Sequence, residues 1–164
     1  MKIAVVYYSM SENTAFAADR IAARLGADCI RLTPVKSIPD KGFRKFLWGG
    51  KSALMGETPE LEPYTFDAEK YDVLIFGTPV WASSPAPPVR SFIKAQGQAL
   101  AGKRFYAFAC LMGSGAEKTF QKFASLLCVD RLAGTLALIE PKNQPTAENE
   151  KKIEKFCAEI EALA

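Results

Sequence analysis

The stretch IAVVYYSMSENT, residues Ile3–Thr14, decides the fold because it joins an apolar run to a polar one. Its first six residues are continuously hydrophobic, which is typical of a strand buried on both faces of a parallel sheet. Its last six residues carry three hydroxyls and one amide, and the helical spacing of Ala18, Ile21, Ala22 and Leu25 follows them. The stretch therefore predicts a buried strand, a polar turn and an amphipathic helix.

The same alternation of strand and helix continues along the chain. The predicted strands are Ile3–Tyr8, Asp28–Leu32, Val73–Gly77, Phe105–Cys110 and Leu132–Ile139, of which the second is the weakest. Helical spacing returns at Val89–Ile93, Phe120–Leu127 and Ile153–Ile160. Thr146 stands where it could cap the last of these helices. This order predicts an α/β fold with a doubly wound parallel sheet, and we expect residues 1–164 to form one domain.

A long connection, Pro34–Tyr71, separates the second and third predicted strands. It is rich in basic and large apolar residues, and its apolar spacing from Phe43 to Met55 is partly helical. We expect an irregular helix flanked by loops, resting on one edge of the sheet. It is either a packed connector or a functional segment, since long connections in compact domains are often functional.

Composition and charge exclude several functional classes. The net charge of +3 is too small and too dispersed to predict nucleic-acid binding. No apolar run approaches the roughly 20 residues that a membrane span needs, and the N-terminus lacks the features of a signal peptide. We therefore expect a cytoplasmic protein with no membrane association.

Histidine is absent from the chain, and the four cysteines, Cys29, Cys110, Cys128 and Cys157, form no C-x-x-C pair. We expect these cysteines to be reduced. We also expect no metal site and no histidine-based catalytic triad.

In an open doubly wound sheet, a ligand binds beyond the carboxyl ends of the strands, where the strand order reverses. The segments after the first, third and fourth predicted strands are therefore the candidate site. The first segment is Ser9, Met10, Ser11, Glu12, Asn13 and Thr14. The second is Thr78, Pro79, Val80, Trp81, Ala82 and Ser83. The third is Cys110, Leu111, Met112, Gly113, Ser114 and Gly115.

Each segment offers a different chemistry. The unpaired N–H groups at a helix start bind phosphate, and the hydroxyls and amide of the first segment can add donors. Trp81 suits stacking on a planar heterocycle, and Gly113 and Gly115 would let a ligand approach the backbone closely. A plain helix cap and a purely structural tryptophan are the alternative interpretations.

Together the three segments resemble those of the flavodoxins, and the resemblance covers nearly the whole chain. Ser9, Ser11 and Thr14 match the hydroxyl positions of the family's phosphate loop, typically Thr/Ser-x-Thr-Gly-x-Thr. Gly77–Trp81 resembles the second flavin loop, and Gly113–Gly115 resembles the third. The resemblance implies a three-layer sandwich with a five-stranded parallel sheet in the order 2-1-3-4-5. It also implies FMN at the point where this order reverses.

Three departures from the family's pattern affect the expected function. Glu12 stands where the family usually has glycine, so we expect its carboxylate to point to solvent or to weaken phosphate binding. The chain is slightly basic, whereas flavodoxins that act as carriers are usually acidic, which argues against a ferredoxin-like partner. The third segment also lacks the aromatic residue that many flavodoxins stack on the second face of the flavin.

The resemblance implies an FMN-binding electron-transfer protein, with an NAD(P)H-dependent FMN quinone reductase of the same fold as the alternative. Both need only binding and tuning from the protein, because the chemistry belongs to the flavin, and we assign no catalytic residue. The expected partner is a redox protein or a small quinone-like acceptor, and we expect a monomer or a homodimer. A phosphoacceptor receiver domain shares the topology, but this chain lacks its cluster of carboxylates at the strand ends. An interaction domain without FMN is a further alternative.

Overall fold

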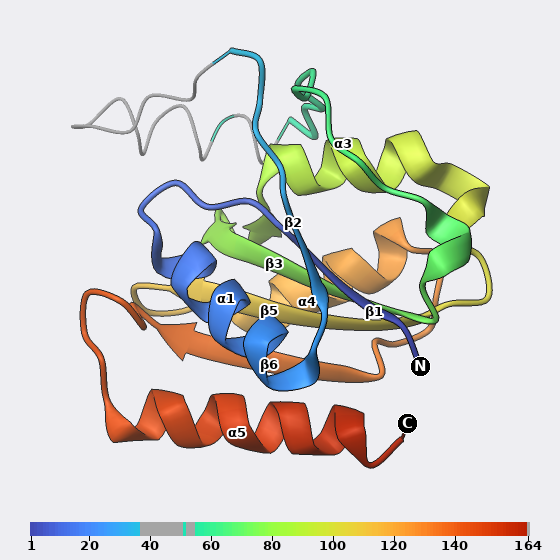
Figure 1. Ribbon diagram of the computed structural model, residues 1–164. Helices are drawn as coiled ribbons and strands as arrows, with labels where there is room; N and C mark the ends of the chain where they lie inside the picture. The colour runs from blue at the N-terminus through green and yellow to red at the C-terminus, as the bar shows by residue number, and fades with distance from the viewer. Residues whose placement is uncertain (37–50, 52–54, 164) are drawn as a thin grey trace.

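The computed structural model, drawn in Figure 1, describes residues 1–36, 51 and 55–163. Within these residues, one sheet holds five parallel strands in the order β2-β1-β3-β5-β6, and β4 pairs antiparallel with β3. The strands are β1 (Ile3–Tyr7), β2 (Asp28–Arg31), β3 (Val73–Trp81), β4 (Ser84–Pro85), β5 (Arg104–Leu111) and β6 (Gly134–Ile139). The order of the parallel strands confirms the predicted 2-1-3-4-5 arrangement.

Helices cover both faces of the sheet and form the outer layers of a three-layer sandwich (Figure 1). The helices are α1 (Asn13–Leu25), α3 (Pro87–Gln96), α4 (Ala116–Leu126) and α5 (Ala147–Glu161), with short 3-10 turns η1 (Ala68–Lys70) and η2 (Gly97–Leu100). α1 and α5 pack on one face, and α3 and α4 pack on the other. Thr146 caps α5 as predicted, because its side chain accepts a hydrogen bond from the N–H of Asn149 at 3.1 Å.

Alternate residues of each central strand face opposite layers, which explains the continuous apolar runs. In β1, Ile3, Val5 and Tyr7 point toward α1 and α5, whereas Ala4 and Val6 point toward α3 and α4. All five are buried. A strand covered on both faces needs apolar side chains at every position, and the start of the chain supplies them.

The third strand is longer than predicted. β3 continues through Thr78–Trp81, which the sequence suggested as a loop, and then turns through Ala82 and Ser83 to pair with β4. Gly77 permits this continuation, because a Cβ at that position would overlap the ring of Phe108 on β5. The length of a strand is set by pairing with its neighbours, so apolar runs alone did not reveal the extension.

Two further expectations concern the start of the last strand and the long connection Pro34–Tyr71. β6 begins at Gly134, two residues later than predicted. The helix expected between Phe43 and Met55 falls on residues outside the described ranges, apart from positions 51 and 55. Within those ranges, no helix combines the length and the hydropathy that a bilayer crossing requires.

Candidate functional site

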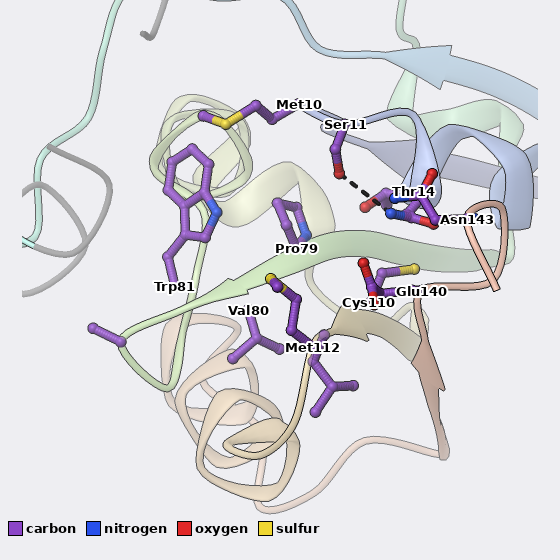
Figure 2. A pocket seen from close by; sticks show the side chains of 13 residues that line it. Met10, Ser11, Thr14, Pro79, Val80, Trp81, Cys110, Met112, Glu140 and Asn143 are labelled. Carbon is purple, nitrogen blue, oxygen red and sulfur yellow. Dashed lines mark hydrogen bonds between the residues drawn. The ribbon is translucent and has the colours of Figure 1, made fainter. Parts of the chain in front are cut away.

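A cavity of about 330 Å³ lies at the carboxyl ends of β1, β3, β5 and β6, beside the start of α1. The predicted residues that line it are Met10, Ser11, Asn13, Thr14, Pro79, Val80, Trp81, Ala82, Cys110, Leu111 and Met112. Glu140 and Asn143 also line it and were not predicted. Figure 2 shows Asn143 beside Thr14 at one end of the cavity, with Trp81 and Met10 at the other.

One end, which we call the polar end, is lined by Ser11, Asn13, Thr14, Glu140 and Asn143. α1 begins at this end. The first N–H groups of a helix have no partner inside the helix and carry partial positive charge. Together with the hydroxyl and amide donors of the lining residues, they form a site suited to an anion.

The hydroxyls of the first segment have different roles. Ser9 is buried and does not line the cavity; its Oγ accepts a hydrogen bond from the N–H of Ala15 at 3.1 Å and so satisfies one N–H of the first turn of α1. Ser11 is exposed, and its Oγ accepts a hydrogen bond from Nδ2 of Asn13 at 3.3 Å. Thr14 is 2% exposed yet lines the cavity. Ser11 and Thr14 are therefore the hydroxyls that a ligand can meet.

Glu12 is turned away from the cavity by an ion pair. Its backbone is left-handed, with φ 62° and ψ 0°, a conformation that glycine adopts without strain. Its carboxylate accepts hydrogen bonds from both terminal nitrogens of Arg31, at 2.5 and 3.2 Å. These bonds lower the pKa of Glu12 and keep it ionised. Of the two expectations for Glu12, the structure supports the one in which the carboxylate points away from the ligand.

The opposite end, which we call the apolar end, is lined by Met10, Val80, Trp81, Ala82 and Met112. Trp81 is half-buried and packs edge-on against Tyr8, with ring centroids 5.7 Å apart and ring planes at 81°. Met112 is 73% exposed, so its side chain is accessible from solvent. An indole and two polarisable thioethers form a surface that suits a flat aromatic ligand.

The third segment supports the hairpin that carries Trp81. Ala82 and Ser83, the central residues of the hairpin turn, have φ values of 47° and 53°, as in turns that usually contain asparagine or glycine. Gly115 lies against this turn, since a Cβ on Gly115 would be 2.8 Å from Oγ of Ser83 and 3.2 Å from Cγ1 of Val80. The hairpin therefore fills the space beside Gly115, whereas the sequence suggested that a ligand would approach the backbone there.

The predicted residues that do not line the cavity are Ser9, Glu12, Thr78, Ser83, Gly113, Ser114 and Gly115. Thr78 is buried, and its Oγ1 accepts a hydrogen bond from the N–H of Ala86 at 2.8 Å, which ties β3 to the start of α3. Gly113 and Ser114 are exposed, and the space around Gly113 is open. Several of these residues therefore support the segments that line the cavity without lining it themselves.

Sequence reasoning missed Glu140 and Asn143, which belong to the turn after β6. Oδ1 of Asn13 accepts hydrogen bonds from the backbone N–H groups of Lys142 at 2.9 Å and Asn143 at 3.3 Å. The turn therefore lies against the start of α1. Glu140 directly follows the last predicted strand, so the rule that located the other three segments would also have located this one.

Cys110 lines the cavity but is not a nucleophile at neutral pH. Burial raises the pKa of its thiol to about 12, and a hydrogen bond with Thr14 opposes only part of that rise. A thiol with such a pKa stays protonated and unreactive. Among the described residues, no group of three or more histidine, cysteine, aspartate or glutamate side chains could hold a metal ion. The residues that line the cavity are therefore better suited to binding a reactive group than to taking part in a reaction.

The family model described as Flavodoxin matches residues 2–131, which is most of the chain. No curated protein matches the sequence.

Several solved structures share the fold. A flavoprotein from Lactobacillus acidophilus NCFM, in complex with FMN, has a TM-score of 0.75 at 16% identity, and the match covers 94% of this chain and 97% of that one. A flavodoxin from Streptococcus pneumoniae TIGR4 has a TM-score of 0.65 at 16% identity, with 100% of both chains covered. A flavodoxin from the domain Archaea has a TM-score of 0.59 at 16% identity, with 98% and 96% covered. At these identities, the likeness shows the fold.

Proposed function

The chain belongs to the flavodoxin family, and we propose that it binds one FMN in this cavity and passes electrons through it. The observation that carries the proposal is the division of the cavity into a polar and an apolar end. FMN has a phosphate, a chain bearing hydroxyls and a planar ring, in that order. The order of these groups matches the order of the lining from the start of α1 to Trp81.

The chain's own residues would bind and orient the cofactor. The N–H groups of the first turn of α1 and the hydroxyls of Ser11 and Thr14 would hold the phosphate. Trp81 would stack on the ring or contact its edge. When bound, the flavin supplies one- and two-electron transfer. We assign no proton transfer to a side chain, and the protonated Cys110 would only contribute to the wall.

One observation favours the alternative of an NAD(P)H-dependent quinone reductase with the same cofactor. Glu12 is neutralised by Arg31 outside the cavity, so Glu140 is the one acidic side chain among the described residues that line it. Acidic side chains near a flavin make its second electron harder to add, and few acidic side chains line the described part of this cavity. A site of this kind favours two-electron transfer to a small acceptor over one-electron transfer to a partner protein.

A spectrum of the purified protein and one mixing experiment test both functions. We expect visible flavin bands, and mass spectrometry of the released cofactor should give FMN. Release of FAD, or no flavin uptake by the apoprotein after addition of FMN, would contradict the proposal. Anaerobic mixing with NADPH and with NADH then separates the two functions. Rapid bleaching of the flavin bands indicates a reductase, and no reaction with either nucleotide indicates a carrier.

A further inference from the structure

The turn between β6 and α5, Glu140–Asn143, closes the polar end of the cavity from a distant part of the chain. Asn13 anchors it, because its Oδ1 accepts hydrogen bonds from two consecutive N–H groups, those of Lys142 at 2.9 Å and Asn143 at 3.3 Å. Asn13 is 6% exposed, so these bonds are largely shielded from water. The anchor therefore holds the Asn143 backbone beside the start of α1.

The other end of the turn is held beside β5. The N–H of Glu140 donates to the carbonyl of Leu111 at 3.2 Å. Glu140 has a left-handed backbone with φ 38°, and such strain at a non-glycine residue often occurs at ligand sites. Gln144 orients the carboxylate, because its Nε2 donates to Oε2 at 2.6 Å. Pro141, which follows Glu140, is buried and restricts the turn further.

The turn also brings positive charge to the polar end. The first segment contains no basic residue, but Lys142 lies near enough to Glu12 to contribute to the lowering of its pKa. The charge of Glu12 is already balanced by its ion pair with Arg31. Lys142 therefore adds a positive charge near the start of α1, where an anion is favoured, and Glu140 in the same turn carries a negative one.

We propose that Glu140–Asn143 is a fourth flavin-binding segment, in which the Asn143 amide donates to the FMN phosphate and Glu140 accepts from a hydroxyl of the ribityl chain. This inference rests on FMN binding in the cavity. Asn143 lies beside the start of α1, and its amide carries two donors, which suits a phosphate. An ionised carboxylate only accepts hydrogen bonds. Glu140 would repel a phosphate, so it suits the hydroxyls next to the phosphate.

Asn143→Ala tests the donor. Asn13 binds the backbone of Asn143 and not its side chain, and the side chain belongs to an exposed residue, so the truncation leaves the anchored turn intact. Titration of the apoprotein, with quenching of flavin fluorescence as the signal, should show that FMN binds at least ten-fold more weakly. Riboflavin binding should stay unchanged within two-fold. Asn143→Asp keeps the size but exchanges the donors for negative charge, and it should weaken FMN binding further while sparing riboflavin.

Glu140→Gln tests the acceptor and should give a different pattern. Because a ribityl hydroxyl is present in both ligands, FMN and riboflavin should lose affinity by the same factor, between three-fold and ten-fold. Tighter FMN binding with unchanged riboflavin binding would place Glu140 against the phosphate and overturn its assignment.

Two outcomes separate failure of this inference from failure of the proposed function. If Asn143→Ala binds FMN as tightly as the unmodified protein while Ser11→Ala binds it more weakly, the turn only packs against α1. FMN binding would then stand without the fourth segment. If the unmodified apoprotein takes up neither FMN nor riboflavin, the proposed function fails and this inference fails with it. Thermal unfolding of each variant shows whether a lost affinity comes from a lost fold.

Discussion

The two ends of the cavity are built in different ways. Side chains assemble the polar end, where Asn13 anchors the turn after β6 and Glu12 pairs with Arg31. Backbone pairing assembles the apolar end, where β3 pairs with β4 and Gly115 makes room for the turn at Ser83. A side-chain network can lose one bond at a time, whereas a hairpin is kept or lost as a unit. The difference implies that recognition of the phosphate and recognition of the ring can be changed separately.

Ser11→Ala should have the largest effect on that separation. A hydrogen bond to a charged group contributes roughly 1.5–3 kcal/mol, so FMN binding should weaken by about that amount. Riboflavin, which lacks the phosphate, should bind almost as before. Fluorescence titration of the apoprotein with both ligands measures the difference.

Ser114→Ala is the matched control for Ser11→Ala, because Ser114 is an exposed hydroxyl of the third segment that does not line the cavity. It should change neither affinity. Equal losses of FMN and riboflavin affinity in Ser11→Ala would show that the polar end does not hold the phosphate. The comparison between the two ends would then fail.

Trp81→Ala should give the complementary pattern at the apolar end. Stacking of a heterocycle on an aromatic side chain contributes about 1–3 kcal/mol, and the ring is common to both ligands. FMN and riboflavin should therefore lose the same amount of affinity. An unchanged affinity for both ligands would show that Trp81 does not contact the ring.

Fluorescence of Trp81 provides an independent measurement of the same contact. The chain has two tryptophans, so the Trp48→Phe variant isolates the emission of Trp81. A stacked flavin quenches an indole, and most of this emission should return when FMN is removed. Emission that is equally strong with and without FMN would contradict stacking.

The spacing of the two one-electron reduction potentials tests the charge around the ring. A carboxylate about 10 Å from the ring, at an effective dielectric near 20, contributes on the order of 1–2 kcal/mol, or roughly 60 mV. Since few acids line the described part of the cavity, the second potential should lie close to the first. Anaerobic reductive titration should then proceed mainly as one two-electron step. Two well-separated steps would indicate a one-electron carrier, in which a backbone carbonyl of Thr78–Ser84 accepts a hydrogen bond from the flavin N5–H.

Glu12→Gly should have the smallest effect, on stability. Relief of a left-handed backbone at a non-glycine residue contributes about 1 kcal/mol, and loss of an exposed ion pair removes about 0–1 kcal/mol. The variant should therefore be slightly more stable than the unmodified protein at neutral pH. Urea unfolding at pH 7 measures this difference.

Acidification should widen that difference. In the folded protein, the pKa of Glu12 lies below its usual value of 4.5, mainly because of the hydrogen bonds from Arg31. The folded state therefore binds fewer protons at this position than the unfolded state. The stabilisation by the ion pair is present above about pH 4.5 and is lost as the pH falls through the lowered pKa. The advantage of Glu12→Gly should thus be larger at pH 3.5 than at pH 7. A constant difference would show that Arg31 contributes nothing at this position.

The sequence by itself determined the alternation of buried strands and amphipathic helices, because both depend on patterns within a few residues. The run Ile3–Tyr8 predicts a strand covered on both faces, and the spacing after it predicts α1. The rule that ligands bind beyond strand ends then located Ser11, Thr14 and Trp81, which line the cavity. The family resemblance added the strand order, which the structure confirms.

Only the tertiary structure decided which distant residues meet at the polar end. Asn13 binds the N–H groups of Lys142 and Asn143 from 129 and 130 positions away, and no local pattern records such a pair. The pairing of Glu12 with Arg31 depends on β1 and β2 lying in register side by side. Side-chain contacts between neighbouring strands and turns follow from how the sheet is assembled, so they could be read only after the elements were placed.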